Sequence, residues 1–223
     1  TRLELTRSLS EEFDQTHATD LVKQRLAVMS RIENLIDTPF SKALDLESVP
    51  ADERARYCEG EFASRAILAR RLLETGVPFV EITQNGWDTH TNNFNSCSRL
   101  CQEIDQPWAA LMDDLKSSGL LDETLIVWMG EFGRTPIING NRGRDHFPSV
   151  VPVVLGGAGV ARGQVVGKTN EHGTAIDGIR HTVPDLFATI FTALGINPFG
   201  EFETGFGSMT QATDHGEPIP DLV

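Results

Sequence analysis

The sequence is poor in cysteine, in positive charge and in long apolar runs, and each shortage excludes a class of protein. Its 3 cysteines are too few, and odd in number, for the disulfide framework of a small secreted domain. Its 19 Lys and Arg residues are outnumbered by 32 Asp and Glu residues, which gives a formal charge of −13. An acidic surface repels phosphate backbones, so no general nucleic-acid binding is expected. No apolar run approaches ~18 residues, so no membrane span is expected either.

The sequence does contain enough apolar material for a folded core. Hydrophobic residues make up 39% and charged residues 23%, a balance that excludes a disordered chain. Helical periodicity predicts helices over residues 8–37, 53–75, 94–118 and 183–194. Short β-rich runs predict strands over residues 77–83, 124–129, 150–155 and 164–167. This alternation predicts an α/β fold with a largely parallel sheet flanked by helices.

Local signals add detail to these elements. Pro107 is expected to kink the third helix or to start a new segment there. Residues 124–129 are almost all apolar, which is typical of a central strand buried on both faces. Pro152 favours an edge position or the beginning of a strand, and Thr182 is the expected N-cap of the last helix. No linker divides the chain, so a single domain over residues 1–223 is expected, with residues 1–52 as a helical lead-in.

Three polar clusters lie beside predicted strands and carry the chemistry of the sequence. Gly86-Trp-Asp-Thr-His90 follows residues 77–83, and Gly130-Glu-Phe-Gly-Arg134 follows residues 124–129. The third cluster, Gly143-Arg-Asp-His146, precedes residues 150–155. Ligands bind at the strand ends of α/β sheets, so the three clusters are expected to converge.

The residue types in these clusters favour a divalent metal. Asp88, His90, Glu131 and His146 are the candidate ligands, since mixed carboxylate and imidazole sets suit Zn²⁺ or Mn²⁺. Zinc is the expected ion, with manganese, magnesium and calcium as alternatives. Such an ion activates a nucleophile and neutralises charge on a phosphoryl-type group. Arg134 and Arg144 are the candidate catalytic residues, as clamps for an anionic substrate.

Each candidate also has a purely structural interpretation. Asp88 could cap the following helix, Glu131 could be a carboxylate held by Arg134, and His146 could be an ordinary loop histidine. A pairing of Glu131 with Arg134 would favour this structural interpretation. The cysteines are interpreted as buried or incidental thiols. Gly156-Gly-Ala-Gly159 lacks the helix start of a dinucleotide site, so it is interpreted as a turn and no organic cofactor is expected.

The three clusters in this order, together with Ala69-Arg-Arg-Leu-Leu-Glu-Thr-Gly-Val-Pro-Phe-Val80, resemble an uncharacterised bacterial family. That family is abundant in planctomycetes and is often exported with a twin-arginine leader. The resemblance covers roughly residues 40–200. The family is similar in turn to the alkaline phosphatase and sulfatase superfamily, which implies an alkaline-phosphatase-like fold.

The superfamily likeness implies roles for particular residues. Asp88 and His90 match its metal-binding Asp and His, and His146 matches a third ligand that precedes a strand and a Gly-rich turn. Glu131 and Phe132 stand where the superfamily has an Asp-His pair. This departure implies a lost ligand, a changed metal or the loss of one of two metal sites. Residues 183–195 resemble the superfamily's final helix.

The resemblance also implies that this chain corresponds to the C-terminal half of such a protein. The first metal-binding Asp and the nucleophile would then belong to an N-terminal half, and no nucleophile is assigned here. The implied activity is metal-dependent hydrolysis of small phosphate or sulfate esters, incomplete in this chain alone. The alternative is a non-catalytic binding or envelope protein of the same fold. A periplasmic or exported location follows from the resemblance alone.

Overall fold

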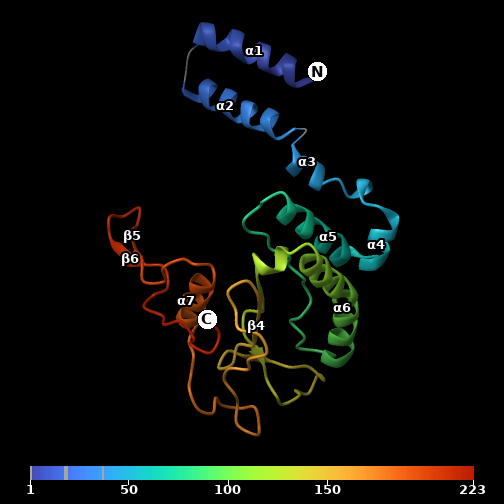
Figure 1. The fold of residues 1–223 in the computed structure, drawn as a ribbon, viewed down its shortest axis with the longest axis vertical. Helices are drawn as coiled ribbons and strands as arrows, with labels where there is room; N and C mark the ends of the chain where they lie inside the picture. The colour runs from blue at the N-terminus through green and yellow to red at the C-terminus, as the bar shows by residue number, and fades with distance from the viewer. Residues whose placement is uncertain (1, 18–19, 37) are drawn as a thin grey trace. The chain divides into compact units, whose positions relative to one another are not determined.

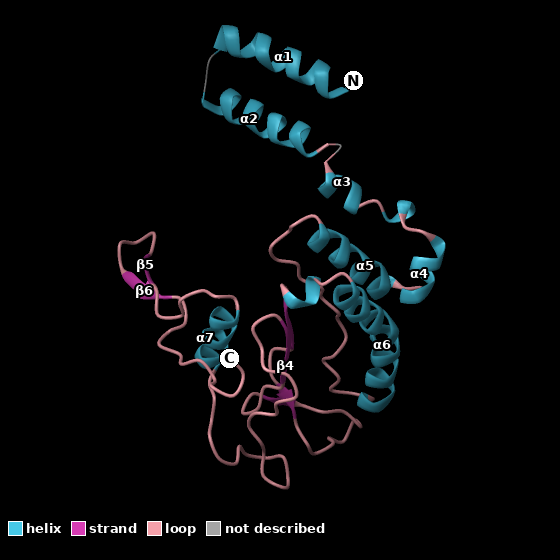
Figure 2. Cartoon of the chain, viewed as in Figure 1, coloured by secondary structure: helices cyan, strands magenta, loops and turns pink. Residues whose placement is uncertain are grey.

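The computed structural model describes residues 2–17, 20–36 and 38–223 as helices, short strands and long loops (Figures 1 and 2). The helices are α1 (Arg2–His17), α2 (Asp20–Leu35), α3 (Pro39–Ala43), α4 (Ala51–Tyr57), α5 (Glu61–Glu74), α6 (Asn93–Ser117) and α7 (Val183–Ala193), with short 3₁₀ turns η1 (Leu46–Ser48) and η2 (Leu120–Asp122). The strands are β1 (Leu125–Met129), β2 (Gly133–Arg134), β3 (His146–Phe147), β4 (Val153–Gly157), β5 (Glu201–Glu203) and β6 (Met209–Gln211). None of the described helices is long and apolar enough to cross a membrane. The chain divides into two compact units, Thr1–Ile82 and Thr83–Val223.

The first unit is helical, and α5 carries most of its core. The buried side chains of α5 recur at helical spacing on one stripe: Phe62, Ala63, Ala66, Ile67 and Ala69. Arg71 on the same helix donates to the carbonyl oxygens of Lys42 at 2.7 Å and Ala43 at 3.0 Å. These carbonyls lie at the end of α3, so Arg71 fastens α3 to α5.

Two helices predicted as continuous are divided in the first unit. The segment predicted as one helix over 8–37 forms α1 and α2, which pack side by side in antiparallel directions (Figure 1). Residues 18, 19 and 37 of that prediction lie outside the described residues. The segment predicted over 53–75 breaks between α4 and α5, where Cys58 has a φ of 62° and Gly60 a φ of 134°. Positive φ values cannot continue a right-handed helix, so the prediction of one helix was wrong there.

The second unit begins with α6, whose buried face is formed by Leu100, Ile104, Leu111 and Leu115. Pro107 lies inside α6 and starts no new segment, contrary to one of the two expectations. Gly119, with a φ of 80°, follows the C-cap Ser118 and closes the helix.

Strands β1 and β4 pair in an antiparallel ladder that runs from Leu125 opposite Gly157 to Met129 opposite Val153. The predicted strand at 124–129 is therefore confirmed, and β4 begins directly after Pro152. The expectation of burial on both faces was wrong, because Trp128 is 45% exposed and Met129 is 47% exposed. Among the described residues β1 pairs with β4 alone.

The remaining ladders are short. Strands β2 and β3 form one antiparallel pair and β5 and β6 another, and every ladder in the described ranges has two strands. No strand forms over residues 77–83 or 164–167 in the described chain, contrary to both predictions. A short apolar run forms a strand only when its backbone groups can hydrogen-bond to a neighbouring strand, and these two runs have no such neighbour among the described residues. The largely parallel, alkaline-phosphatase-like sheet is not among these ladders and stays a prediction.

Helix α7 begins with the N-cap that the sequence predicts. The Thr182 hydroxyl accepts from the backbone N–H of Asp185, and the Asp185 carboxylate accepts from the backbone N–H of Thr182 at 2.6 Å. The same carboxylate accepts from the backbone N–H of Glu217 at 3.0 Å. These bonds, that of Glu217 first, lower the pKa of Asp185. The capping box thus also fixes the tail against the start of α7.

Thr182→Ala is expected to lower the free energy of unfolding by about 1 kcal/mol, because it removes the side-chain acceptor of the N-cap. Urea denaturation followed by circular dichroism measures this change. Thr192→Ala is the matched control, since Thr192 is exposed in the last turn of α7. Equal midpoints for the two variants would contradict the capping role.

Candidate functional site

The site begins with a backbone clamp at the start of α6. The backbone N–H of Asn92 donates to the carbonyl of Asn141 at 3.2 Å, and that of Asn93 donates to the carbonyl of Arg142 at 3.0 Å. The N–H of Arg144 returns a bond of 3.0 Å to the carbonyl of Thr89. The first N–H groups of a helix lack partners within it, so the loop between β2 and β3 caps α6. The clamp brings residues 88–93 beside residues 139–146.

Gly143 makes this close approach possible. A Cβ atom at Gly143 would lie 1.8 Å from the carbonyl oxygen of His90, a distance that no side chain tolerates. Asn139 adds a side-chain bond of 3.1 Å from its Nδ2 to the same carbonyl. Because Gly143 of the third polar cluster has no side chain, its backbone can contact the backbone of the first cluster.

The short β2–β3 pair brings in the second cluster. Arg134 lies directly opposite His146 in the antiparallel register, and Gly133 lies opposite Phe147. Side chains at opposed positions project from the same face of a sheet, so Arg134 and His146 point the same way. The His146 ring also contacts the Phe132 ring, with centroids 4.5 Å apart.

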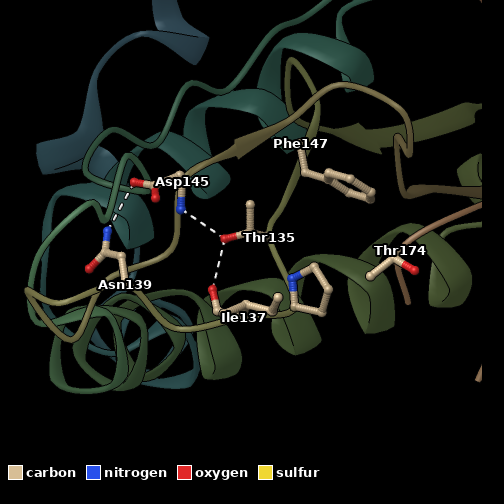
Figure 3. Close-up of a pocket in the computed structure, with 7 residues that line it drawn as sticks. Thr135, Ile137, Asn139, Asp145, Phe147 and Thr174 are labelled. Atoms are coloured by element: carbon tan, nitrogen blue, oxygen red, sulfur yellow. Dashed lines mark hydrogen bonds between the residues drawn. The ribbon is translucent and has the colours of Figure 1, made fainter. Parts of the chain in front are cut away.

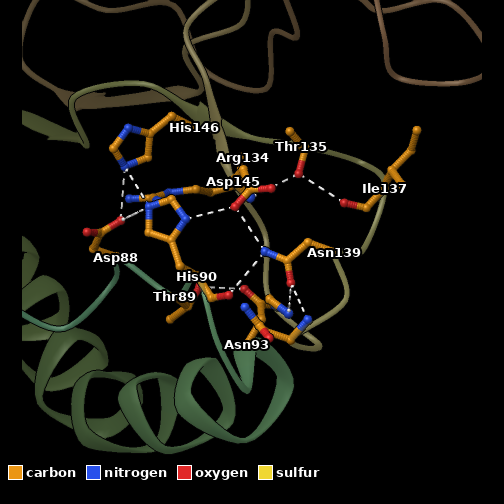
Figure 4. Close-up of polar contacts among 12 residues, drawn as sticks. Asp88, Thr89, His90, Asn93, Arg134, Thr135, Ile137, Asn139, Asp145 and His146 are labelled. Carbon is orange, nitrogen blue, oxygen red and sulfur yellow. Dashed lines mark hydrogen bonds and ion pairs between the residues drawn. The ribbon is translucent and has the colours of Figure 1, made fainter.

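Asp88, His90 and His146 converge at the centre of the site (Figure 4). The Nε2 atom of His146 lies 3.0 Å from Oδ1 of Asp88, and the Nε2 atom of His90 lies 3.1 Å from the same oxygen. The two Nε2 atoms are 3.1 Å apart. Three potential ligand atoms thus face one another, on side chains between 44% and 64% exposed.

Arg134 supplies the positive charge beside this cluster. Its Nη1 donates to Oδ1 of Asp88 at 2.6 Å and its Nη2 donates to Oε1 of Glu131 at 3.1 Å. Arg134 is itself well covered, at 18% exposed. The hydrogen bond from Arg134, and after it the bond from His146, lowers the pKa of Asp88.

The predicted site residues therefore fall into three groups. Asp88, His90 and His146 come together as the proposed ligands. Glu131 is not among the clustered ligand atoms, since its carboxylate pairs with Arg134, the contact that the structural interpretation predicts. Arg144 donates from Nη1 to the carbonyls of Thr135 and Pro136 at 2.5 and 2.8 Å, so its guanidinium braces the loop.

Two residues of the site were missed from the sequence, Asp145 and Asn139. Oδ1 of Asp145 lies 2.8 Å from Nδ1 of His90 and accepts from Nδ2 of Asn139 at 2.9 Å. These two bonds, that of His90 first, lower the pKa of Asp145. Asp145 stands between two candidate residues in Gly143–His146, and carboxylates often support histidine ligands. That signal could have found Asp145, whereas Asn139 required the loop geometry.

The cluster can be tested for its fit to a metal ion. Tetrahedral zinc with ligand bonds of 2.0–2.1 Å separates its ligand atoms by about 3.3 Å. The three separations of 3.0 to 3.1 Å are close to that value. One carboxylate and two imidazoles match the three-ligand set of catalytic zinc, which keeps a further position open. The donor chemistry and spacing thus fit zinc.

A pocket of about 210 Å³ lies beside Asp145 (Figure 3). It is lined by Thr135, Pro136, Ile137, Asn139, Asp145, Phe147 and Thr174. Successive strand residues face opposite sides, so Phe147 and His146 point away from each other. None of the three ligand residues lines this pocket.

Comparison with known proteins shows a match to a family model. The family model described as "Protein of unknown function (DUF1501)" matches residues 1–223. No curated protein and no solved structure matches the chain.

Gly143→Ala is expected to destabilise the second unit by about 1–3 kcal/mol, because the new methyl group must displace the backbone of His90. Urea denaturation measures this loss. Gly140→Ala is the matched control in the same loop, where an added Cβ meets no atom within 4 Å. A Gly143→Ala protein as stable as the control would contradict the clamp.

Arg134→Gln is expected to raise the pKa of Asp88 toward the ordinary value of about 3.9. Because its pKa is lowered, the ionised Asp88 carboxylate stabilises the folded state. This contribution is present above the ordinary pKa and is lost as the pH falls through the lowered pKa. A ¹³C NMR titration of the carboxyl groups measures the shift. Arg162→Gln, which removes an exposed arginine paired with Asp122, is the control and leaves Asp88 unchanged.

Proposed function

The chain belongs to the DUF1501 family of unknown function, and from its site we propose that it is a metal-dependent hydrolase of small phosphate or sulfate esters. The convergence of Asp88 Oδ1, His90 Nε2 and His146 Nε2 beside Arg134 carries this proposal. Kinship with the alkaline phosphatase and sulfatase superfamily, with its largely parallel sheet, is part of the proposal. So are a planctomycete-type bacterial origin, an exported location and completion of the site by an N-terminal half of the same protein.

Asp88, His90 and His146 would hold the ion, with zinc as the first choice. A bound divalent ion lowers the pKa of a nucleophile and offsets negative charge on the group that is transferred. Their partial exposure leaves this face open to a small ester. The nucleophile is not assigned to any residue of this chain.

Arg134 would bind the anionic group of the substrate. A guanidinium carries five N–H donors, and the bonds to Asp88 and Glu131 engage two of them. Asp88 and Glu131 hold the side chain in place, so the remaining donors are oriented before a substrate arrives. Planar donor pairs of this kind suit phosphate and sulfate oxygens. Arg134 is preferred over Arg144, whose Nη1 is engaged by loop carbonyls.

The alternative is a non-catalytic binding or envelope protein with the same fold. The pairing of Glu131 with Arg134 favours it, because Arg134 then neutralises the carboxylates that an ion would otherwise neutralise. In this alternative the polar side chains link the loops to one another by hydrogen bonds and ion pairs, and they bind no metal ion. Metal content separates the two functions.

The proposed hydrolase is expected to contain zinc when it is purified without chelator. Elemental analysis should find about one ion per chain, which the double variant Asp88→Ala, His146→Ala loses. His172→Ala is the control, because His172 is an exposed histidine whose partner is Glu171. If metal is present, the longer protein that the resemblance implies is then screened with aryl phosphates and aryl sulfates. In that protein Arg134→Ala is expected to lower kcat by about 10²–10³-fold.

Absence of metal after incubation with zinc and manganese would overturn the metal site in this chain. The same assay on the longer protein that the resemblance implies would then decide whether an N-terminal half is required. Metal retained equally by the double variant would place the ion elsewhere.

A further inference from the structure

The orientation of the Asn139 amide is fixed by backbone groups alone. Its Oδ1 accepts from the N–H of Asn141 and from the N–H of Gly143, each at 2.9 Å. A backbone N–H can only donate, so the atom that faces both must be the amide oxygen. The Nδ2 group of Asn139 must therefore point the other way.

This orientation determines the polarity of the next bond. Nδ2 of Asn139 donates to Oδ1 of Asp145 at 2.9 Å, so this oxygen is an acceptor and carries no proton. The Nδ1 atom of His90 lies 2.8 Å from the same oxygen. Two acceptors cannot form a hydrogen bond, so Nδ1 of His90 must carry a proton.

We propose that Asp145 is a positioning residue that holds His90 as its Nδ1–H tautomer and so presents an unprotonated Nε2 to the metal site. The proposal rests on the proposed function only for naming the ligand, because the tautomer follows from hydrogen bonds within the chain. A neutral imidazole has one proton, and with it on Nδ1 the lone pair on Nε2 faces Nε2 of His146, 3.1 Å away, which can donate to it. The Asp88 oxygen 3.1 Å from the same Nε2 makes no hydrogen bond with it and is neutralised by Arg134.

His146 lacks such a partner and serves as an internal comparison. Its Nε2 lies 3.0 Å from Oδ1 of Asp88, and its Nδ1 makes no hydrogen bond to another residue of the described ranges. In the metal-free protein its Nε2–H donates to the Asp88 carboxylate. Binding of an ion by Nε2 of His146 would require the proton on Nδ1 instead. The two histidines of the site therefore differ: His90 would keep its tautomer on metal binding and His146 would change it.

The backbone of Asp145 is braced independently of its carboxylate. Its N–H donates to Oγ1 of Thr135 at 3.0 Å, and the Thr135 hydroxyl donates to the carbonyl of Ile137 at 2.9 Å. The Asp145 carboxylate lies 2.8 Å from Nδ1 of the His90 ring (Figure 4). Carboxylates that support a histidine ligand commonly change metal affinity by about 10–100-fold.

The first test is ¹⁵N NMR of the histidine side chains in metal-free protein at about pH 8.5, where an ordinary imidazole is neutral. A His90→Gln variant assigns the His90 signals. The expected result is a protonated Nδ1 and an unprotonated Nε2 in the wild-type protein. Asp145→Asn keeps an acceptor oxygen and should preserve this tautomer, whereas Asp145→Ala should give a mixture. A His90 signal with the proton on Nε2 in the wild type would overturn the proposal, whatever the variants do.

The second test is zinc affinity, measured by competition with a chromophoric chelator. Asp145→Ala is expected to weaken binding by about 10–100-fold, and Asp145→Asn by a smaller factor. Equal affinity for Asp145→Ala and wild type would overturn the positioning role. A wild-type protein that binds no zinc but shows the expected tautomer would overturn the proposed function and leave the effect of Asp145 on His90 intact.

Discussion

The site depends on one steric constraint, the contact between the backbone at Gly143 and the carbonyl of His90. No other residue type leaves room for that approach, and the approach lets the β2–β3 loop bond to the first N–H groups of α6. The clamp is made of backbone atoms on both sides, so the side chains of residues 88–93 and 139–146 remain available for chemistry. Asp88, His90 and His146 are near one another because of these main-chain bonds, and their own contacts come second.

Asp88 is the electrostatic centre of the arrangement. One of its oxygens faces Arg134, His90 and His146, and Arg134 and His146 can donate hydrogen bonds to it. In water-exposed surroundings each such contact is worth little alone, since solvent screens it. The orientation of these side chains therefore matters more to the site than the strength of each contact. Partners outside the cluster maintain that orientation. Glu131 holds Arg134, and Asp145 holds His90.

The sequence was most informative where local rules decide the structure. Thr182 was identified as a helix N-cap because capping depends on a few adjacent residues, and strand β1 was identified from its apolar run. Residues 77–83 and 164–167 form no strand, because pairing depends on partners that the local pattern does not contain. At the site, Asp88, His90 and His146 stood in recognisable clusters, and their meeting was expected. The positions of Glu131, Arg144 and Asp145 depend on loop geometry, which spacing in the sequence does not encode.

The β2–β3 ladder contains only two residue pairs, Gly133 with Phe147 and Arg134 with His146. So short a ladder cannot determine its own register, and a shift by one residue would turn His146 to the side of the pocket. The register is therefore supported by bonds outside the ladder. Beside it, the N–H of Thr135 donates to the carbonyl of Asp145 at 2.9 Å, and at the far end of the loop residues 139–144 bond to residues 89–93. It follows that this site could be transplanted into another protein only as two complete segments. These are residues 88–93 with the start of α6, and residues 131–147. Transplanting the three ligand residues alone would supply the metal-binding groups without the backbone contacts that bring them together.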